Sequence, residues 1–197
     1  MNQAISEFET YLSIQKGYSP LTVAAYKHDL QRFYRFMQSQ QITDVVQSVT
    51  SQHIYNYLAY LAHPSDNKRP NSAVTRARKL ASVRSFFNFL HRYQKIDSNP
   101  SAMIEVPSVP LKEPEYLTQK EYLQFLTTIK EKATPFYRER DIAIALLFLG
   151  TGIRVSELVG LELSNLDFDT ATIKVRRKGN KEQTIPLSSA VLTALAN

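Results

Sequence analysis

Arg154, Glu157 and Lys178 are the candidates for chemistry in this sequence. Arg154 follows a glycine-flanked helix end and Glu157 comes three residues later, so one new helical turn can present both side chains. Lys178 lies at the tip of a predicted hairpin. An arginine fork can hold two oxygens of one phosphate, and an exposed lysine can give a proton to a leaving alkoxide. The pattern indicates phosphate chemistry; an ordinary Arg–Glu helix pair and a turn lysine kept for solubility are its alternatives.

Two predicted helices lead up to the arginine. Thr118 and Glu121 have the spacing of a capping box, which predicts the start of the first helix. Residues 138–149 are nearly all apolar after a charged start, and this composition predicts a central core helix. Gly150 and Gly152 are expected to end it, because glycine readily takes the left-handed conformation that closes a helix.

A small β element is predicted after the arginine. Short β-type runs at about 171–177 and 182–187 flank a Gly179-Asn180 turn, which is the pattern of a hairpin. Ser188 is expected to cap a last helix. Together with the two preceding helices, these elements predict an α+β second region.

The first half of the chain is expected to form four helices. Apolar residues recur at intervals of three and four over 5–12 and 23–37, and Ser19 is the predicted N-cap of the second helix. A third helix is expected to be capped by Ser51. The fourth covers about residues 72–93.

The predicted fourth helix carries most of a basic window over residues 67–96, which holds eight Lys and Arg residues and no acid. Arg78, Ser82 and Ser85 lie opposite its apolar face, where small hydroxyls beside an arginine would let the helix approach a phosphate backbone. Arg76 and Arg84 project nearer the apolar side, and a plain solvated helix face is the alternative. The predicted nucleic-acid-binding residues are Arg76, Arg78, Lys79, Ser82, Arg84, Ser85, Arg177 and Lys181.

Composition supports a globular protein with an anionic partner. The net charge is +6 and the isoelectric point is about 9.4. The absence of cysteine excludes disulfides and thiolate chemistry. The N-terminus does not read as a signal peptide, and the longest apolar run, 142–150, is too short to span a bilayer. We therefore expect a soluble cytoplasmic protein that is not bound to a membrane.

The predicted domains are a helical domain over residues 1–106, a proline-rich linker over 107–117 and an α+β region over 118–197. Proline removes a backbone donor and disfavours helix in the residue before it. The linker is therefore expected to be an extended tether.

The second region resembles the first half of the catalytic domain of tyrosine site-specific recombinases, particularly the Xer and integrase branch. Residues 19–33 and 78–90 are similar to the family's core-binding domain, and Asn99-Pro100 and Leu117-Thr118 to its junction. The motifs that carry the resemblance are Thr151-Gly152-Ile153-Arg154, Glu157-Leu158, Lys178-Gly179-Asn180-Lys181 and Ile185-Pro186-Leu187.

The resemblance implies roles for the three candidate residues. Arg154 would clamp the scissile phosphate, Lys178 would protonate the leaving 5′ oxygen, and Glu157 would orient the site rather than react. The implied reaction cleaves and rejoins DNA through a 3′-phosphotyrosyl link and uses no metal and no other cofactor. The implied partners are double-stranded DNA and further subunits, identical or not, in the tetrameric synapse of an intact parent protein.

The implied fold is mainly α with a small β-hairpin sheet. A four-helix, SAM-like core-binding domain would be followed by the N-terminal part of an α+β catalytic domain. In the family, the two domains form a C-shaped clamp that holds opposite faces of the duplex.

This sequence departs from the family pattern in three places. Arg177 stands where relatives often carry glycine, and Gln183 where many carry arginine. The family's His-x-x-Arg box, a further His or Trp and the tyrosine nucleophile follow the hairpin, whereas the last of the 11 tyrosines here is Tyr137. We therefore expect this chain to bind DNA without cleaving it.

Three hypotheses remain open on the sequence. The chain is a truncated recombinase that keeps DNA binding, a natural non-catalytic DNA-binding regulator of recombination, or a helical interaction protein whose basic patches are incidental. The third predicts binding that does not respond to salt, whereas binding that neutralises DNA phosphates weakens steeply as salt rises.

Overall fold

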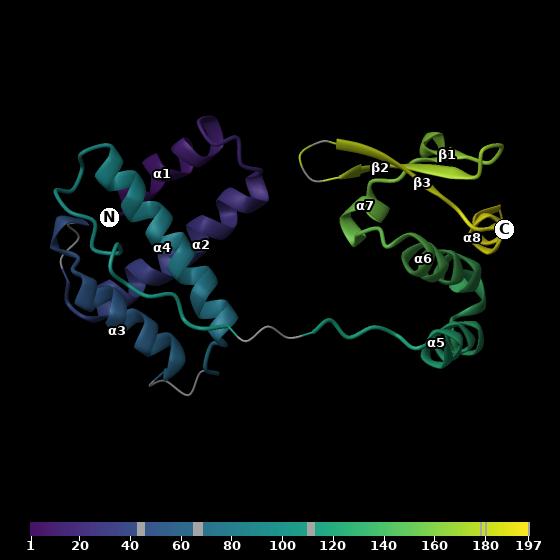
Figure 1. Cartoon of the computed structure of the whole chain (residues 1–197), viewed down its shortest axis with the longest axis horizontal. Coiled ribbons are helices and arrows are strands. Elements are labelled where there is room, and N and C mark those ends of the chain that lie inside the picture. The colour runs from purple at the N-terminus through teal and green to yellow at the C-terminus, as the bar shows by residue number, and fades with distance from the viewer. Residues whose placement is uncertain (43–45, 65–68, 110–112, 178, 180, 197) are drawn as a thin grey trace. The chain divides into compact units, whose positions relative to one another are not determined.

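The computed structural model describes residues 1–42, 46–64, 69–109, 113–177, 179 and 181–196. The chain divides into two compact units, Met1–Lys112 and Glu113–Asn197 (Figure 1). The division falls within the segment 107–117 that the proline content marks as a linker.

The first unit is a helical bundle, as predicted. Ser19 accepts a hydrogen bond from the backbone N–H of Thr22 and so caps the second helix, which Pro20 begins. A 3-10 turn, Val46–Ser48, precedes the third helix. The helices are α1 (Asn2–Ile14), α2 (Pro20–Ser39), α3 (Ser51–Ala62) and α4 (Ala73–Arg92).

The predicted cap of the third helix is wrong by one residue. Thr50 is the N-cap of α3, because its hydroxyl accepts from the His53 N–H while the His53 ring accepts from the Thr50 N–H at 3.1 Å. The Ser51 hydroxyl instead donates to the carbonyl of Pro100 at 2.8 Å. This side chain therefore ties α3 to the segment that follows α4.

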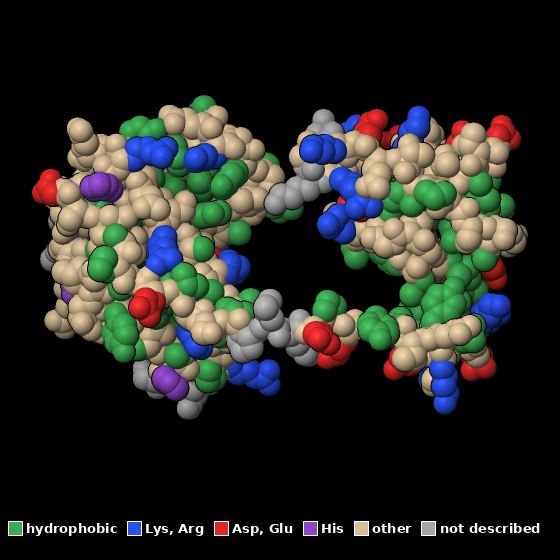
Figure 2. Space-filling view, in the orientation of Figure 1, with side chains coloured by type: hydrophobic (Ala, Val, Ile, Leu, Met, Phe, Trp, Pro, Cys, Tyr) green, Lys and Arg blue, Asp and Glu red, His purple; other side chains and the backbone are tan. Residues whose placement is uncertain are grey.

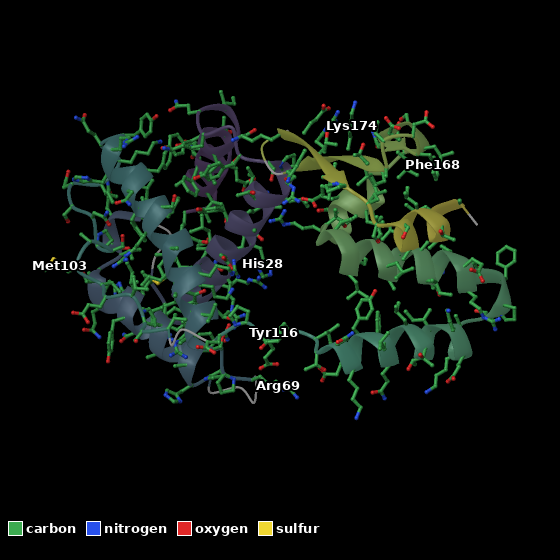
Figure 3. The ribbon with its side chains drawn as sticks, turned by 45° about the vertical axis from the view of Figure 1, so that its right-hand side comes forward. His28, Arg69, Met103, Tyr116, Phe168 and Lys174 are labelled. Atoms are coloured by element: carbon green, nitrogen blue, oxygen red, sulfur yellow. The ribbon has the colours of Figure 1, made fainter. Side chains whose placement is uncertain are left out.

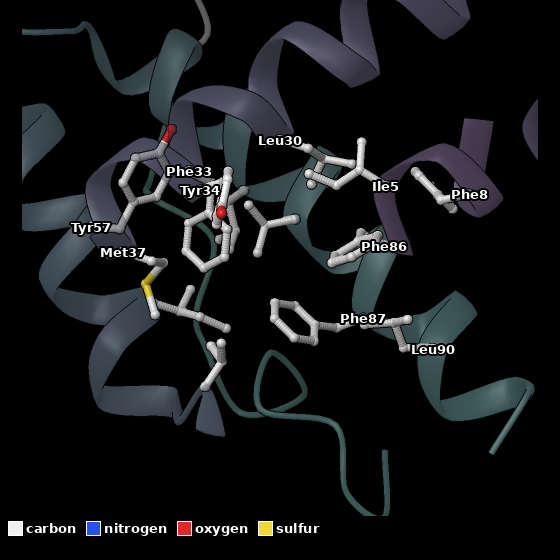
Figure 4. Close-up of a cluster of buried hydrophobic side chains, with 14 of the residues drawn as sticks. Ile5, Phe8, Leu30, Phe33, Tyr34, Met37, Tyr57, Phe86, Phe87 and Leu90 are labelled. Atoms are coloured by element: carbon white, nitrogen blue, oxygen red, sulfur yellow. The ribbon is translucent and has the colours of Figure 1, made fainter. Parts of the chain in front are cut away.

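The core of the first unit is rich in aromatic side chains (Figure 4). Phe33 meets Tyr57 edge to face at a centroid distance of 5.1 Å, and Phe8 meets Phe86 in the same way at 5.6 Å. Such pairs add about 0.5–1.5 kcal/mol each beyond the area they bury. The unit is therefore a stiff platform for the side chains on its surface.

Helix α4 is more deeply buried than its wheel predicts. It contacts α1, α2 and α3, so it is buried over a wider arc than its apolar stripe alone. Ser82 was expected opposite the apolar face, but only 5% of it is exposed. The buried residues of α4 are Lys79, Leu80, Ser82, Val83, Phe86, Phe87, Phe89 and Leu90.

The second unit places helices beside a small antiparallel sheet with strand order β1-β2-β3. The predicted hairpin is present, with Ile173 opposite Ile185. Strand β1 was not predicted, because two residues are too short to give an alternating pattern. The helices are α5 (Gln119–Lys132), α6 (Arg138–Thr151), α7 (Val155–Val159) and α8 (Ser189–Ala196), the 3-10 turns are Pro135–Tyr137 and Leu163–Asn165, and the strands are β1 (Leu166–Asp167), β2 (Thr172–Arg177) and β3 (Lys181–Pro186).

The expected central core helix is only partly buried. In α6, only Ile142, Ala145 and Leu147 are buried. A Cβ at Gly150 would lie 3.1 Å from the Val191 side chain, so the glycine allows α6 and α8 to pack closely. Helix α5, whose start is capped by Thr118 and Glu121 as predicted, buries none of its residues. No helix in the described part of the chain is long and apolar enough to cross a membrane.

Candidate phosphate site and nucleic-acid interface

The end of α6 sets the position of Arg154. Gly152 takes the left-handed conformation, with φ +64°, and its N–H donates to the carbonyl of Phe148 at 2.9 Å. The chain then turns, and Arg154, in an extended conformation, becomes the N-cap residue of α7. A left-handed cap followed by an extended residue redirects the backbone within three residues, and this turn starts α7 at the predicted arginine.

Arg154 and Glu157 form the pair that their spacing predicts. One carboxylate oxygen of Glu157 accepts from the Arg154 backbone N–H at 2.9 Å, and the other accepts from Arg154 Nη1 at 2.9 Å. The Glu157 side chain is 4% exposed, whereas that of Arg154 is 65% exposed. A buried carboxylate thus holds the exposed guanidinium through one N–H, and the other N–H groups have no hydrogen-bond partner among the described residues and can bind an anion.

Glu157 is held in its ionised form. The backbone N–H of Arg154 makes the largest contribution and lowers the pKa of Glu157, burial opposes it, and the charges of Arg154 and Arg177 lower it further. A carboxylate that stays ionised keeps its grip on the arginine at neutral pH.

A cavity of about 460 Å³ lies beside this pair, between α7 and the hairpin. Arg177 lines it from the same face of β2 as the buried Ile173 and Val175, and its Nε is buried without a hydrogen-bond partner among the described residues. Lys174 also lines it and projects from β2 (Figure 3). The cavity is polar and carries both signs of charge, from Glu157, Glu162, Lys174, Arg176, Arg177 and Glu182.

The sequence predicts that the candidate lysine lies at the tip of the hairpin. Lys178 itself lies outside the described residues, as does Asn180. The neighbouring Gly179 has φ +81°, and Arg177 pairs in register with Lys181, which is exposed. Figure 2 shows basic side chains gathered at this end of the second unit. The described part of the tip thus brings two of the predicted nucleic-acid-binding residues together.

The basic residues of α4 are arranged around an acid on α2. Asp29 is 1% exposed and accepts from Arg78 Nη1 at 2.5 Å and Nη2 at 3.1 Å. It also accepts from Lys79 Nζ at 2.8 Å and from the Ser82 hydroxyl at 3.0 Å. Lys79 and Ser82 are therefore enclosed and bound to a carboxylate, whereas the Arg78 side chain remains 54% exposed.

Asp29 is the functional candidate that the sequence reasoning missed. It is the one acid in α2, and it lies three residues after Tyr26 and four before Phe33, on the side of the helix that packs. The sequence signal for such a buried partner is a single acidic residue at a position where the helix is otherwise apolar, when the helix packed against it contains no acid. Charge counting over α4 alone could not reveal it.

The other predicted residues of α4 are partly enclosed. Arg76 donates to the carbonyl of Asn71 at 2.7 Å, and Arg84 donates to the carbonyl of Ile104. Both are half-buried, in agreement with their predicted place near the apolar side. Ser85 is half-buried. Among the predicted residues of α4, Arg78 is the exposed one.

Known proteins are similar to this chain over nearly its whole length. Residues 5–94 match the phage integrase N-terminal SAM-like domain, and residues 115–197 match the phage integrase family. Tyrosine recombinase XerC of Caldanaerobacter subterraneus subsp. tengcongensis is 38% identical over 211 residues, which cover 98% of this chain and 57% of the relative. XerC of Anoxybacillus flavithermus is 35% identical, with coverage of 99% and 62%. The chain thus spans about three-fifths of the length of these relatives.

A solved structure shows the same fold. The lambda integrase tetramer bound to a Holliday junction has a TM-score of 0.71 and 19% sequence identity, and the match covers 96% of this chain and 52% of that one. Along this chain, the helical bundle, the turn that begins α7 and the hairpin come in the same order as the sequence motifs described above. With both domains matched, this chain belongs to the phage integrase family of tyrosine recombinases.

Proposed function

We propose that this chain binds duplex DNA and holds one backbone phosphate for strand cleavage and rejoining in site-specific recombination. The exposed guanidinium of Arg154, held by the buried carboxylate of Glu157, is the observation that carries the proposal. The similarity to XerC proteins, which are named as tyrosine recombinases, supports this assignment.

In the proposed reaction, a tyrosine oxygen attacks the phosphorus and forms a 3′-phosphotyrosyl link, while the bond to the 5′ oxygen breaks. The free N–H groups of Arg154 would donate to the non-bridging oxygens, where negative charge builds up in the transition state. Lys178 would give a proton to the leaving 5′ oxygen. No tyrosine follows Tyr137 in these 197 residues, so we expect them to bind DNA without forming the link by themselves.

The proposed DNA contacts are the basic side chains that solvent can reach. Arg78 on α4 and Lys181 on the hairpin are exposed and are the principal ones, and the half-buried Arg177 is paired in register with Lys181. Arg76, Arg84 and Ser85 would contribute from half-buried positions. We do not assign contacts to Lys79 and Ser82, because Asp29 already binds both.

Assembly is the second part of the proposal. The matched lambda integrase forms a tetramer on a Holliday junction. We propose that this chain likewise belongs to a synaptic assembly of identical or related subunits on DNA.

Salt-dependent binding tests the proposal. Binding of a labelled duplex is followed by fluorescence anisotropy at several salt concentrations, and the affinity should fall with a log–log slope of about −0.9 for each phosphate neutralised. Lys120→Ala, which removes an exposed cation from α5, is the control and should leave the slope unchanged. Absence of binding, or an affinity that does not respond to salt, would refute DNA binding.

A second candidate function is a non-catalytic regulator that competes for recombination sites. The exposed cations proposed for DNA binding would serve such a regulator equally well. Adding the chain to a reaction of an active recombinase on the shared site tests this candidate: a competing regulator lowers product in proportion to site occupancy, and unchanged product at full occupancy would refute it. If the chain instead forms a covalent complex with a nicked duplex, the regulator hypothesis is wrong.

A further inference from the structure

The Asp29 carboxylate makes more hydrogen bonds than a surface ion pair provides. Two N–H groups of Arg78, the ammonium of Lys79 and the hydroxyl of Ser82 all donate to it, at 2.5–3.1 Å. Lys79 and Ser82 are buried with it, so they fix the carboxylate between α2 and α4. Arg78 binds from outside, which makes Asp29 a rigid support for a flexible side chain.

The support leaves Arg78 able to bind a second anion. A guanidinium has five N–H groups, and Asp29 accepts one from each Nη atom, so Nε–H and two further N–H groups remain without a partner in the part of the chain that the structure describes. The side chain is 54% exposed, so these groups can reach a ligand in solvent. Two cations share one carboxylate here, so the cluster keeps a net positive charge.

His28 lies beside the cluster at the surface of α2 (Figure 3). Its Nδ1 is 3.9 Å from Asp29, beyond hydrogen-bond distance, and its side chain is 68% exposed. The groups that hold the carboxylate are therefore the three side chains of α4.

We infer that Asp29 is a positioning residue for DNA binding: it holds the Arg78 guanidinium at the surface in the orientation in which that group binds a backbone phosphate. The inference rests on the proposed function. Because the Arg78 side chain is already ordered in the free protein, less conformational entropy is lost when the complex forms. A fixed fork also matches the two oxygens of a phosphate better than a mobile one.

The direction in which one substitution changes the DNA affinity tests the inference. Asp29→Asn removes a negative charge, so charge counting alone predicts tighter DNA binding. Positioning predicts weaker binding, because the fork loses its support. Removing Asp29 alone would leave Lys79 buried and charged without its partner, so the comparison is made in the background of Lys79→Met, which has a similar length and no charge.

We expect D29N/K79M to bind a labelled duplex about three- to tenfold more weakly than K79M, the range for ordering one side chain. Asp97→Asn is the matched control, because it removes an exposed carboxylate of the same unit, and it should bind equally or slightly more tightly than the unaltered chain. Circular dichroism and thermal unfolding show whether each variant is folded before its affinity is compared.

A double-mutant cycle with Arg78→Ala separates positioning from general damage to the unit. When Arg78 is absent, Asn at position 29 should no longer weaken binding and should strengthen it slightly. Equal or tighter binding by D29N/K79M than by K79M overturns the inference, as does the same loss with and without Arg78. Failure of the unaltered chain to bind DNA would instead refute the proposed function.

Discussion

At the residue scale, Arg154 combines an exposed guanidinium with a buried support. Arg154→Ala should weaken duplex binding and reduce the magnitude of the salt slope by about 1, because one phosphate contact is lost. Arg154→Lys should keep the slope and still lose affinity, because an ammonium cannot hold two oxygens as a fork does. Anisotropy titrations over salt measure both quantities, and unchanged binding by both variants would remove Arg154 from the interface.

Asp29 should make the stability of the first unit sensitive to acid. Burial alone would raise the pKa of Asp29, but the hydrogen bonds of Lys79 and Arg78 outweigh it and lower the pKa below its ordinary value of 3.8. A carboxyl with a lowered pKa in the folded state contributes stability that is present above the unfolded pKa and is lost as pH falls through the folded pKa.

Urea unfolding at a series of pH values below about 5 measures this contribution. D29N/K79M should show a smaller loss of stability over this range than K79M, whereas Asp97→Asn should follow the unaltered chain. Identical dependence of stability on pH in D29N/K79M and K79M would show that Asp29 does not supply the acid-sensitive part of the free energy of unfolding.

The sequence predicted the Arg154–Glu157 pair and missed the Asp29 cluster for one physical reason. The first pair lies three residues apart, so helix geometry alone brings the two side chains together. Asp29 and Arg78 come from different helices, and only packing decides that they meet. For the same reason the burial of Lys79 and Ser82 could not be read from a wheel of their own helix.

At the scale of the element, the turn between α6 and α7 depends on the left-handed Gly152. Gly152→Ala should destabilise the second unit by about 1–2 kcal/mol, because an L residue at φ +64° is strained even though nothing lies within 4 Å of the added Cβ. The midpoint of its thermal unfolding, followed by circular dichroism, should fall accordingly.

Gly160→Ala is the matched control at the end of α7. Gly160 has φ −88°, which any residue adopts, and a Cβ there would lie 3.6 Å from its nearest neighbour. It should change the midpoint little. Equal effects of the two substitutions would show that backbone strain is not the cause.

Elements with local signals were predicted well. The capping box of Thr118 and Glu121 and the cap by Ser19 begin helices where the sequence places them. Strand β1 was not predicted, because its two residues are too few for an alternating pattern and only their pairing with β2 defines the strand. The N-cap of the third helix is Thr50 rather than Ser51, because two adjacent hydroxyl residues compete for the cap and a hydrogen bond to the carbonyl of Pro100 engages Ser51.

At the scale of the whole molecule, the two units have separate cores. The core of the first draws on residues up to Ile104, and that of the second on residues from Leu146 onward. We therefore expect calorimetry to show two unfolding transitions. D29N/K79M should move one of them and Gly152→Ala the other. A single transition that both variants shift would show that the units unfold together.

This division has a consequence for how such genes diversify. A crossover within codons 107–117 would join one complete hydrophobic core to another, because none of the described residues of that segment belongs to the core of either unit. Hybrid descendants would inherit two intact folding units, whereas a crossover inside α4 would split the aromatic core of the first. The family fold thus lets selection exchange the bundle that carries Arg78 while leaving the Arg154 turn unaltered.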